Sequence, residues 1–283
     1  MTGAAEQSGE RATRAGGLPI VHVAEDRSFV VVNKPAGLLS VPGRGAERDP
    51  AKADCVTSRV RAAFPEAAGP MVVHRLDMET SGLMVVALTR RAQRELSGLF
   101  ERRRVRKRYV ALLGAAAKAS EAEASERVQR LRAMGRGEVT AAVRLDPDDR
   151  PRQVYDPRRG KPTLTRWRVL RDEERPGTFA AEARVDRSVV RVEFEPVTGR
   201  SHQLRVHAAL EADAGGGGEA GGGGLGLPIK GDTLYGAGVG RADETGAVSR
   251  APRPASAVGP LRLHAWRLRI DEVALDVSCE RAS

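Results

Sequence analysis

The sequence has very few cysteines: Cys55 and Cys279 are the only two among 283 residues, and neither belongs to a CxxC pair. A disulfide scaffold and a zinc ribbon are therefore excluded, and a reducing compartment is expected. No apolar run approaches the roughly 20 residues that a bilayer span requires, which excludes an integral membrane protein. The first 17 residues lack the apolar stretch of a secretory signal. We therefore expect a cytoplasmic protein, with a plastid or mitochondrial one as the alternative.

Positive charge, in contrast, is abundant. Lys and Arg number 47, and Asp and Glu number 37, which gives a formal net charge of +10. This excess favours a polyanionic partner, nucleic acid first and an acidic membrane second. Hydrophobic residues make up 41% of the chain, enough to bury a sizeable core, so wholesale disorder is excluded. Together these features predict a folded protein that binds nucleic acid.

The hydrophobic pattern predicts a mixture of strands and helices. Strands are expected at 29–32, 71–73, 83–88, 109–113 and 190–194, and helices at 55–64, at 90–101 and from Ser201, a good N-cap, onward. In the last of these strands, Val190, Val192 and Phe194 alternate with charged residues, which predicts one buried face and one solvent-facing one. Strands and helices joined by connections of varied length indicate an α+β fold with one continuous core.

Segments of small or polar residues set the expected boundaries. A disordered tail is predicted at 1–18, one large domain at 19–275 and a second tail at 276–283. The domain carries three predicted insertions, at about 115–137, 211–225 and 238–259. The second insertion is glycine-rich, but no GK[ST] follows it, so a phosphate-binding loop is not expected there. We interpret the second and third insertions as mobile loops.

One polar segment stands out between two predicted strands. His74, Arg75 and Asp77 precede the tripeptide Thr80-Ser81-Gly82. That tripeptide suffices for a turn, and a turn has no need of His-Arg-x-Asp. From the pattern alone, a functional loop and a charged surface turn are equally good interpretations. The carboxylates of Asp77 and Glu79 also suggest glycosidase chemistry, although in an extended loop they would point to opposite sides.

Five sequence blocks identify the chain more closely. They are Val31–Gly43, His74–Gly82, Pro196–His207, Gly226–Gly236 and Leu263–Ala265. In content and order they resemble the RluA family of RNA pseudouridine synthases, over roughly residues 20–270. Five ordered blocks are far more specific than any single one. The residues of these blocks are most similar to those of the dual-specificity member of the family, which acts on 23S ribosomal RNA and on transfer RNA.

The resemblance implies an isomerase that detaches uracil from its ribose, rotates it and rejoins it through carbon. Such a reaction needs no hydrolysis, redox change or energy source, so neither a cofactor nor a metal is expected. The implied fold is the pseudouridine synthase fold, a mixed and mainly antiparallel bent sheet with flanking helices and a central cleft. No S4-type RNA-binding domain is expected before the catalytic domain. A monomer is expected, with no membrane and no obligate protein partner.

The resemblance also implies roles for four residues. Asp77 is the expected nucleophile or charge stabiliser, and Arg205 is the expected cation that keeps its carboxylate ionised, because burial against a base would raise the pKa. Tyr109 is expected to stack on the base, a contact worth about 1–3 kcal/mol. The alternative is a strand tyrosine that packs in the core and has no catalytic role. Arg75 is expected to fill the space that the flipped base leaves, or else to contact phosphate or pair at the surface.

Basic residues elsewhere are candidates for RNA phosphate. The run Arg102–Arg108 holds six basic residues in seven positions, and a solvated charge run is its other interpretation. The predicted RNA contacts besides Arg75 are Lys34, Arg104, Arg106, Lys107 and Lys230. His202 and His207 are expected to be framework residues, because no third ligand is spaced for a metal. Asp232 is expected to hold a turn.

The resulting hypothesis is an RNA pseudouridine synthase that acts on structured RNA, namely stem-loops of ribosomal RNA, transfer RNA or both. Two other classes stay open. An RNA-binding or RNA-remodelling factor could keep this fold with dispensable catalysis. A nucleoside or glycoside hydrolase would release free uracil, whereas an isomerase leaves the mass of the RNA unchanged.

Overall fold

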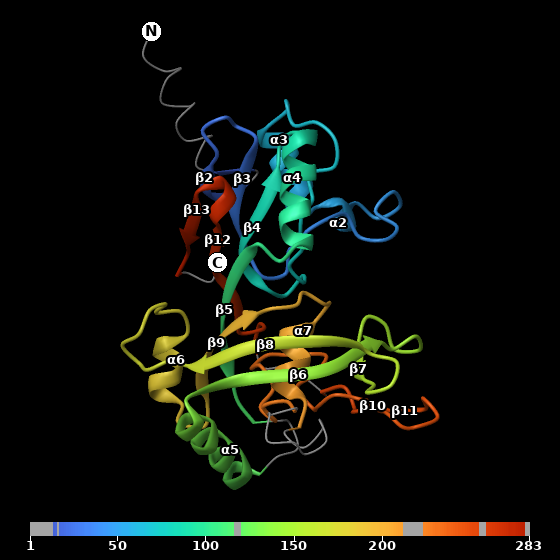
Figure 1. Ribbon diagram of the computed structural model, residues 1–283, viewed down its shortest axis with the longest axis vertical. Helices are drawn as coiled ribbons and strands as arrows, with labels where there is room; N and C mark the ends of the chain where they lie inside the picture. Colours follow the sequence, from blue (N-terminus) through green and yellow to red (C-terminus); the bar gives the residue numbers. More distant parts are fainter. Residues whose placement is uncertain (1–13, 16, 116–119, 212–222, 255–258, 281–283) are drawn as a thin grey trace. The chain divides into compact units, whose positions relative to one another are not determined.

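The computed structural model describes residues 14, 15, 17–115, 120–211, 223–254 and 259–280 (Figure 1). Within these ranges the chain forms two compact units. Unit 1 takes the chain up to Lys107 and again from His264 onward, and unit 2 takes Arg108–Leu263. The chain crosses between the units inside strand β5 (Val105–Leu113) and at the start of strand β12 (Leu263–Ile270). Both units combine strands with helices, which confirms the predicted α+β class.

Unit 1 is built on a sheet in the strand order β1-β2-β3-β4-β12-β13. Its other strands are β1 (Arg14–Ala15), β2 (Leu18–Val23), β3 (Phe29–Lys34), β4 (Ser81–Ala87) and β13 (Leu275–Ser278). Neighbouring strands are antiparallel except β4 and β12, which run parallel with Ser81 opposite His264. Every residue of β3 and β4 is buried, because their apolar, β-branched side chains place them at the centre of the sheet.

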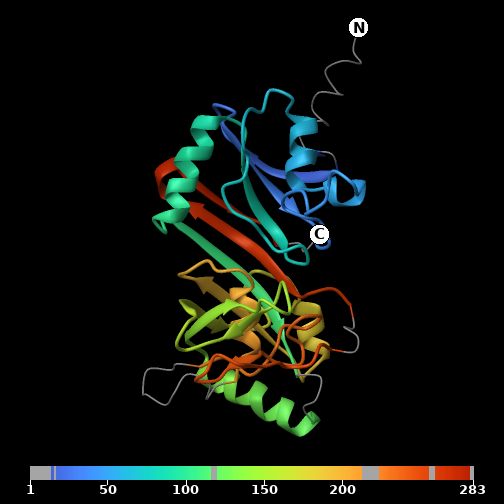
Figure 2. The ribbon, with the colours of Figure 1, turned by 90° about the vertical axis from the view of Figure 1, so that its right-hand side faces the viewer.

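The helices of unit 1 are α2 (Pro50–Ala53), α3 (Val56–Ala63), α4 (Arg90–Glu101) and the short 3-10 helix η1 (Asp271–Val273). Helix α4 has the bounds that the sequence predicts. It begins after Thr89, whose Oγ1 accepts a hydrogen bond from Ala92 N at 3.1 Å. Its Leu96 and Leu99 join the same apolar cluster as Leu268 of β12, and Figure 2 shows α4 beside β12.

Unit 2 is built on a sheet in the strand order β5-β9-β8-β6-β7-β10-β11. Its strands after β5 are β6 (Arg136–Leu145), β7 (Gln153–Tyr155), β8 (Lys161–Val169), β9 (Val190–Pro196), β10 (Arg241–Ala242) and β11 (Val248–Ser249). All neighbours are antiparallel except β7 and β10. The mixed, mainly antiparallel character predicted for the sheet is thus confirmed within each unit.

The helices of unit 2 are α5 (Glu121–Met134), α6 (Ala180–Val185) and α7 (Gln203–Ala209). Helix α7 lies against β6 and β8 (Figure 1), and all seven of its residues are buried. Val206 and Ala209 pack against Ala141 and Val143 of β6. Any polar side chain on this short helix must therefore find a partner inside unit 2.

Several predicted elements differ from those observed. The strand expected at 71–73 is wrong, since only one isolated bridge, from Val72 to Val86, occurs there. The solvent-facing side predicted for β9 is also wrong, because Arg191 and Glu193 are 1% and 5% exposed. Arg191 donates to backbone carbonyls, and Glu193 accepts from Arg168 Nε at 2.9 Å, so neighbours in unit 2 replace water. Helix α7 is capped by His202 rather than Ser201.

The predicted tails and insertions are partly corrected. Residues 1–13 and 16, most of the glycine-rich insertion at 212–222, and residues 255–258 lie outside the described residues. Within the first tail, β1 pairs with β2, and the second tail begins later than 276 because β13 pairs with β12. The loop predicted at 238–259 contains the hairpin β10–β11, joined to β7. The outer boundaries of the catalytic domain stay a prediction.

No helix within the described ranges is both long enough and apolar enough to cross a membrane.

Candidate active site

Asp77 lies in the loop of unit 1 that leads into β4, and it is half-buried. Hydrogen bonds hold the backbone on both sides of it. Leu76 N donates to Ser40 Oγ at 3.1 Å, and Ser40 Oγ donates to Leu76 O at 2.6 Å. On the other side, Met78 O accepts from Lys34 Nζ at 2.8 Å. The segment Val31–Gly43 thus holds the backbone on both sides of Asp77.

Lys34 connects these two segments from inside unit 1. Its Nζ donates, at 2.8 Å each, to the carbonyl oxygens of Pro35, Leu38 and Met78. Burial lowers the pKa of Lys34 to about 8, while the carboxylates of Glu79 and Asp77 oppose that shift. Lys34 is fully buried and its three donors serve backbone carbonyls, which argues against the predicted contact with RNA phosphate.

The start of the same loop is anchored by His74. Its Nε2 accepts a hydrogen bond from Val85 N at 3.0 Å, and its ring stacks on Phe100 with centroids 4.5 Å apart. Burial, with Lys107 as a lesser cause, lowers the pKa of His74 to about 3. A neutral imidazole that accepts from β4 and stacks on α4 is a structural anchor for the loop.

The end of the loop is anchored by Ser81 and by Gly82. His264 Nε2 lies 2.9 Å from Cys279 O, which can only accept, so Nε2 donates and Nδ1 accepts from Ser81 Oγ at 2.9 Å. Gly82 has a φ of +115°, and a Cβ there would lie 2.3 Å from Ala265 O of β12. Only glycine permits this close approach of β4 to β12. In the sequence Thr-Ser-Gly, Ser81 and Gly82 therefore each have a structural role.

Two of the arginines in the run Arg102–Arg106 are ion-paired, and two are exposed without a carboxylate partner in the described ranges. Arg104 Nε lies 2.5 Å from Glu272 Oε1, and Arg106 Nη2 lies 3.0 Å from Asp271 Oδ2. Both of these predicted RNA contacts are thus ion-paired with η1. Their neighbours Arg102 and Arg103 are exposed, and no carboxylate of the described ranges pairs with either. Arg75 is exposed as well.

Lys107 and Lys230 are each engaged with their surroundings. Lys107 is half-buried, its Nζ lies 5.8 Å from the centroid of the Phe100 ring, and burial lowers its pKa. Lys230 Nζ in unit 2 lies 3.0 Å from Asp186 Oδ2. Neither lysine is excluded as an RNA contact, and both assignments stay predictions.

Tyr109 and Arg205 belong to unit 2. Tyr109 lies in β5, opposite Phe194 of β9, and is 8% exposed. Arg205 is on α7 and is also buried. It forms a two-pronged ion pair with Asp232, with Nε 2.8 Å from Oδ2 and Nη2 2.6 Å from Oδ1. The sequence predicts Asp77 as its partner and does not predict Asp232.

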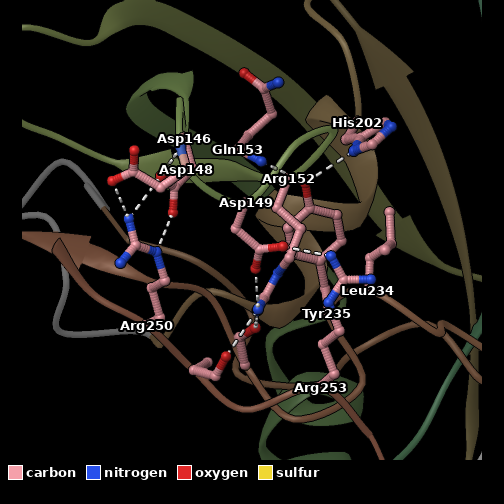
Figure 3. Close-up of polar contacts among 12 residues, drawn as sticks. Asp146, Asp148, Asp149, Arg152, Gln153, His202, Leu234, Tyr235, Arg250 and Arg253 are labelled. Atoms are coloured by element: carbon pink, nitrogen blue, oxygen red, sulfur yellow. Dashed lines mark hydrogen bonds and ion pairs between the residues drawn. The ribbon is translucent and has the colours of Figure 1, made fainter.

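The Asp232 loop also holds the start of α7. Asp232 Oδ1 accepts from Leu234 N at 2.8 Å and from Tyr235 N at 2.9 Å, so the prediction that Asp232 holds a turn is confirmed. Figure 3 shows the Tyr235 hydroxyl between Gln153 N, at 2.7 Å, and His202 Nδ1, at 2.8 Å. His202 is thus a framework residue, as predicted. Burial raises the pKa of Tyr235 above its usual range.

The second framework histidine is buried deeper. His207 Nε2 lies 2.7 Å from Thr163 Oγ1, which itself donates to Ala141 O at 2.6 Å. The threonine proton is committed to the carbonyl, so Nε2 is the donor to Thr163. Burial lowers the pKa of His207 to about 3. The predicted structural role is consistent with a neutral ring that fastens α7 to β8.

The predicted catalytic residues are therefore divided between the units. Asp77 belongs to unit 1, and Arg205 and Tyr109 belong to unit 2, so the pairing of Asp77 with Arg205 stays a prediction. Two sets of contacts were not predicted from the sequence. They are the hydrogen bonds between Ser40 and Leu76, and the contacts of Asp232 and Tyr235 with Arg205 of α7. Both lie inside blocks that carry the family resemblance, which is the signal that could have drawn attention to them.

Comparison with known proteins decides the family. The RNA pseudouridylate synthase family matches residues 28–210, which is more than half of the chain. The chain belongs to this family. Dual-specificity RNA pseudouridine synthase RluA of Salmonella typhi is 36% identical over 255 residues, covering 90% of this chain and 88% of that protein. RluA of Escherichia coli K12 has the same identity and coverage. The predicted RNA pseudouridine synthase, an isomerase, is thus confirmed, and neither alternative class is favoured.

Solved structures agree with this family. Human RNA Pseudouridylate Synthase Domain Containing 1 superposes with a TM-score of 0.55 at 27% identity, covering 94% of this chain and 84% of that one. Human RNA Pseudouridylate Synthase Domain Containing 4 superposes with a TM-score of 0.56 at 24% identity, covering 92% and 87%. The second supports the pseudouridine synthase fold alone.

Proposed function

We propose that this RNA pseudouridine synthase modifies specific uridines in structured RNA, in stem-loops of 23S-type ribosomal RNA, of transfer RNA or of both. The observation that carries the proposal is the loop of Asp77, whose backbone is clamped by Ser40 on one side and Lys34 on the other. A protein that only binds RNA gains nothing from holding one carboxylate so firmly. The RluA relatives are named dual-specificity RNA pseudouridine synthases, which supports a substrate range wider than one RNA.

Asp77 is the proposed catalytic carboxylate, acting as nucleophile or as charge stabiliser when the glycosidic bond breaks. A carboxylate does either only in its ionised form. We propose Arg205 as the cation that favours this form, since a guanidinium stays charged in a buried site and can bind a carboxylate through two N–H groups.

Tyr109 is the proposed platform for the base. Uracil must leave its stack to be turned, and an aromatic ring compensates for part of the lost stacking, by about 1–3 kcal/mol. Arg75, exposed two residues before Asp77, is the residue that we propose to occupy the vacated space in the RNA.

RNA phosphate is proposed to bind first to Arg102 and Arg103. These two are exposed and lack carboxylate partners within the described ranges, whereas Arg104 and Arg106 must first be released from η1. Lys107 and Lys230 remain in the proposed set with smaller contributions. We further propose a cytoplasmic enzyme that works as a monomer, and its two cysteines are free thiols, as a reducing compartment implies.

Modification mapping tests the proposal. The protein is incubated with unmodified transfer RNA and with fragments of 23S ribosomal RNA, and pseudouridine is located by carbodiimide block of reverse transcription. Free uracil is measured in parallel. Pseudouridine at defined positions without free uracil is the expected result. Released uracil would identify a hydrolase, and tight RNA binding without pseudouridine would identify a binding factor.

A further inference from the structure

The carboxylate of Asp232 forms an ion pair with Arg205, one of the residues proposed for catalysis. It accepts from two nitrogens of Arg205, at 2.8 and 2.6 Å, and from the backbone nitrogens of Leu234 and Tyr235. Both side chains of the ion pair are buried, at 4% and 0% exposed. A buried pair with this geometry holds its members in one arrangement, because breaking it would leave a charge without compensation.

The loop around Asp232 is shaped to present this carboxylate. Gly231 has a φ of +79°, and a Cβ there would lie 2.2 Å from Pro260 O. A Cβ at Gly236 would lie 2.6 Å from Asp232 O. Both glycines therefore permit close backbone contacts that another residue would prevent. Every named position of the sequence Gly-Asp-x-x-Tyr-Gly thus serves the placement of Asp232 and Tyr235.

Tyr235 gives Arg205 a second support. The guanidinium of Arg205 lies 5.4 Å from the centroid of the Tyr235 ring, within the range of a cation–π contact. The hydroxyl of the same ring is fixed at its other end by Gln153 and His202 (Figure 3). His202 stands directly before α7, the helix that carries Arg205. The loop therefore fixes both the helix and the end of the arginine side chain.

We propose that Asp232 is a positioning residue for catalysis: it holds the Arg205 guanidinium in one orientation. This inference rests on the proposed function, in which Arg205 keeps Asp77 ionised. A guanidinium carries five N–H donors. Asp232 binds two of its nitrogens, Nε and Nη2. Without Asp232, the guanidinium could turn about its side-chain torsions and would no longer be presented in one orientation.

Substitution of Asp232 by Asn tests this role. Displacing a catalytic group by about 1 Å can cost about 10²-fold in rate, so kcat on a transfer RNA transcript is expected to fall by about that factor. KM is expected to stay within about threefold, because Asp232 does not contact RNA in this account. Asp232→Glu keeps the charge and is expected to retain an intermediate kcat. It also keeps the proposal testable if the Asn variant fails to fold.

A matched ion pair in the same unit provides the control. Asp146 is 1% exposed and binds Arg250 in the same two-pronged way, with Nε 2.7 Å from Oδ2 and Nη2 2.9 Å from Oδ1 (Figure 3). Asp146→Asn removes an equivalent buried carboxylate, but not one that holds Arg205. It is expected to lower thermal stability about as much as Asp232→Asn does and to leave kcat unchanged. Equal kcat values for the two Asn variants would overturn the proposal.

A double-mutant cycle separates positioning from general support of the fold. If Asp232 acts through Arg205, the variant Arg205→Lys with Asp232→Asn has the kcat of Arg205→Lys alone. Multiplicative losses would show that Asp232 acts independently of Arg205 and would overturn the proposal. Failure of the proposed function looks different, since Arg205→Lys alone would then keep the kcat of the wild type.

Discussion

Among single residues, Lys34 places an ammonium group in the interior of unit 1, where its role is structural. Lys34 is fully buried, and its pKa is lowered to about 8 by burial. Three carbonyl oxygens surround its Nζ, and one of them belongs to Met78, next to Asp77. A buried charge is costly unless its hydrogen bonds are satisfied. Here they are satisfied by the backbone on either side of Asp77, so the charge serves to hold the loop of Asp77.

Lys34→Met tests whether this lysine is a clamp or an RNA contact. The substitution releases Met78 O, so we expect the rate of pseudouridine formation to fall by about 10²-fold as Asp77 becomes less well placed. RNA affinity and its salt dependence should stay unchanged, because losing a phosphate contact would reduce the salt slope by about 1.

Lys52→Met is the control for that comparison, since Lys52 is a half-exposed surface lysine that pairs with Asp49. It should retain the rate of the wild type. A Lys34 variant with normal rate and a lower salt slope would show that the lysine binds phosphate after all.

At the scale of elements, the junction between α4 and β5 concentrates positive charge. Helix α4 ends at Glu101, and Arg103 follows with a φ of +58°, a conformation that side chains rarely adopt. After this turn, Arg104 and Arg106 are drawn to the carboxylates of η1. The six basic residues of the run therefore do not act as one surface, and ion pairing decides which of them meet RNA first.

Replacing Arg102 by Ala together with Arg103 by Gly should weaken RNA binding uniformly across RNA sequences. Glycine is chosen because it adopts a positive φ without strain. We expect the salt slope of the binding constant, measured by filter binding, to fall by about 2, one for each lost phosphate contact. Arg104→Ala with Arg106→Ala is the matched pair and should have the smaller effect. If this second pair had the larger effect, the ion pairs with η1 would not protect these arginines from RNA.

Elements were predictable from the sequence where one pattern dominated. Helix α4 follows from its spacing of Leu96 and Leu99 and from the cap at Thr89. Strands β6 and β8 were missed, because their alternation mixes Arg, Thr and Ala and is not clearly apolar on either face. The alternation of β9 was recognised but misinterpreted, since Arg191 and Glu193 find partners inside unit 2. Periodicity identifies a strand, but not whether protein or water covers its polar face.

At the scale of the whole molecule, both units contain a buried, neutral histidine. His264 of unit 1 and His207 of unit 2 are 0% exposed, and burial lowers their pKa values to about 4 and about 3. Their pKa in the unfolded chain is near 6.5. As the pH falls below 6.5, these histidines become protonated in the unfolded chain but stay neutral in the folded one. The stability that these groups contribute is present above pH 6.5 and is lost progressively toward pH 3–4.

Acidification should therefore destabilise the protein before its carboxylates titrate. His74 of unit 1 is a third such group, because burial lowers its pKa to about 3. Between pH 7 and pH 5 we expect the free energy of unfolding, measured in urea, to fall by about 6 kcal/mol for the three histidines together. Asp and Glu in this chain with shifted pKa values have them lowered, so they contribute little in this window. His207→Gln should reduce the pH dependence by about a third. An unchanged pH dependence in that variant would contradict the assignment.

The residues of the candidate site could be predicted from the sequence, but the contacts that their side chains make could not. The blocks around Asp77, Arg205 and Asp232 were recognisable because their sequence is specific to the family. What the sequence does not carry is the direction of each side chain. Lys34 could have faced RNA and instead faces three carbonyls. Asp232 was expected to hold only a turn, yet it also binds Arg205. Such contacts depend on tertiary packing.

We propose that the isomerisation depends on the carboxylate of Asp77. The most direct test of this dependence is pseudouridine formation by Asp77→Asn under single-turnover conditions, on an RNA that the wild type modifies, with RNA binding measured in parallel. Glu79→Gln is the control, since it removes a carboxylate two residues away in the same half-buried loop. The account predicts that Asp77→Asn binds the RNA as tightly as the wild type and forms no pseudouridine, while Glu79→Gln stays active. Full modification by Asp77→Asn would contradict it.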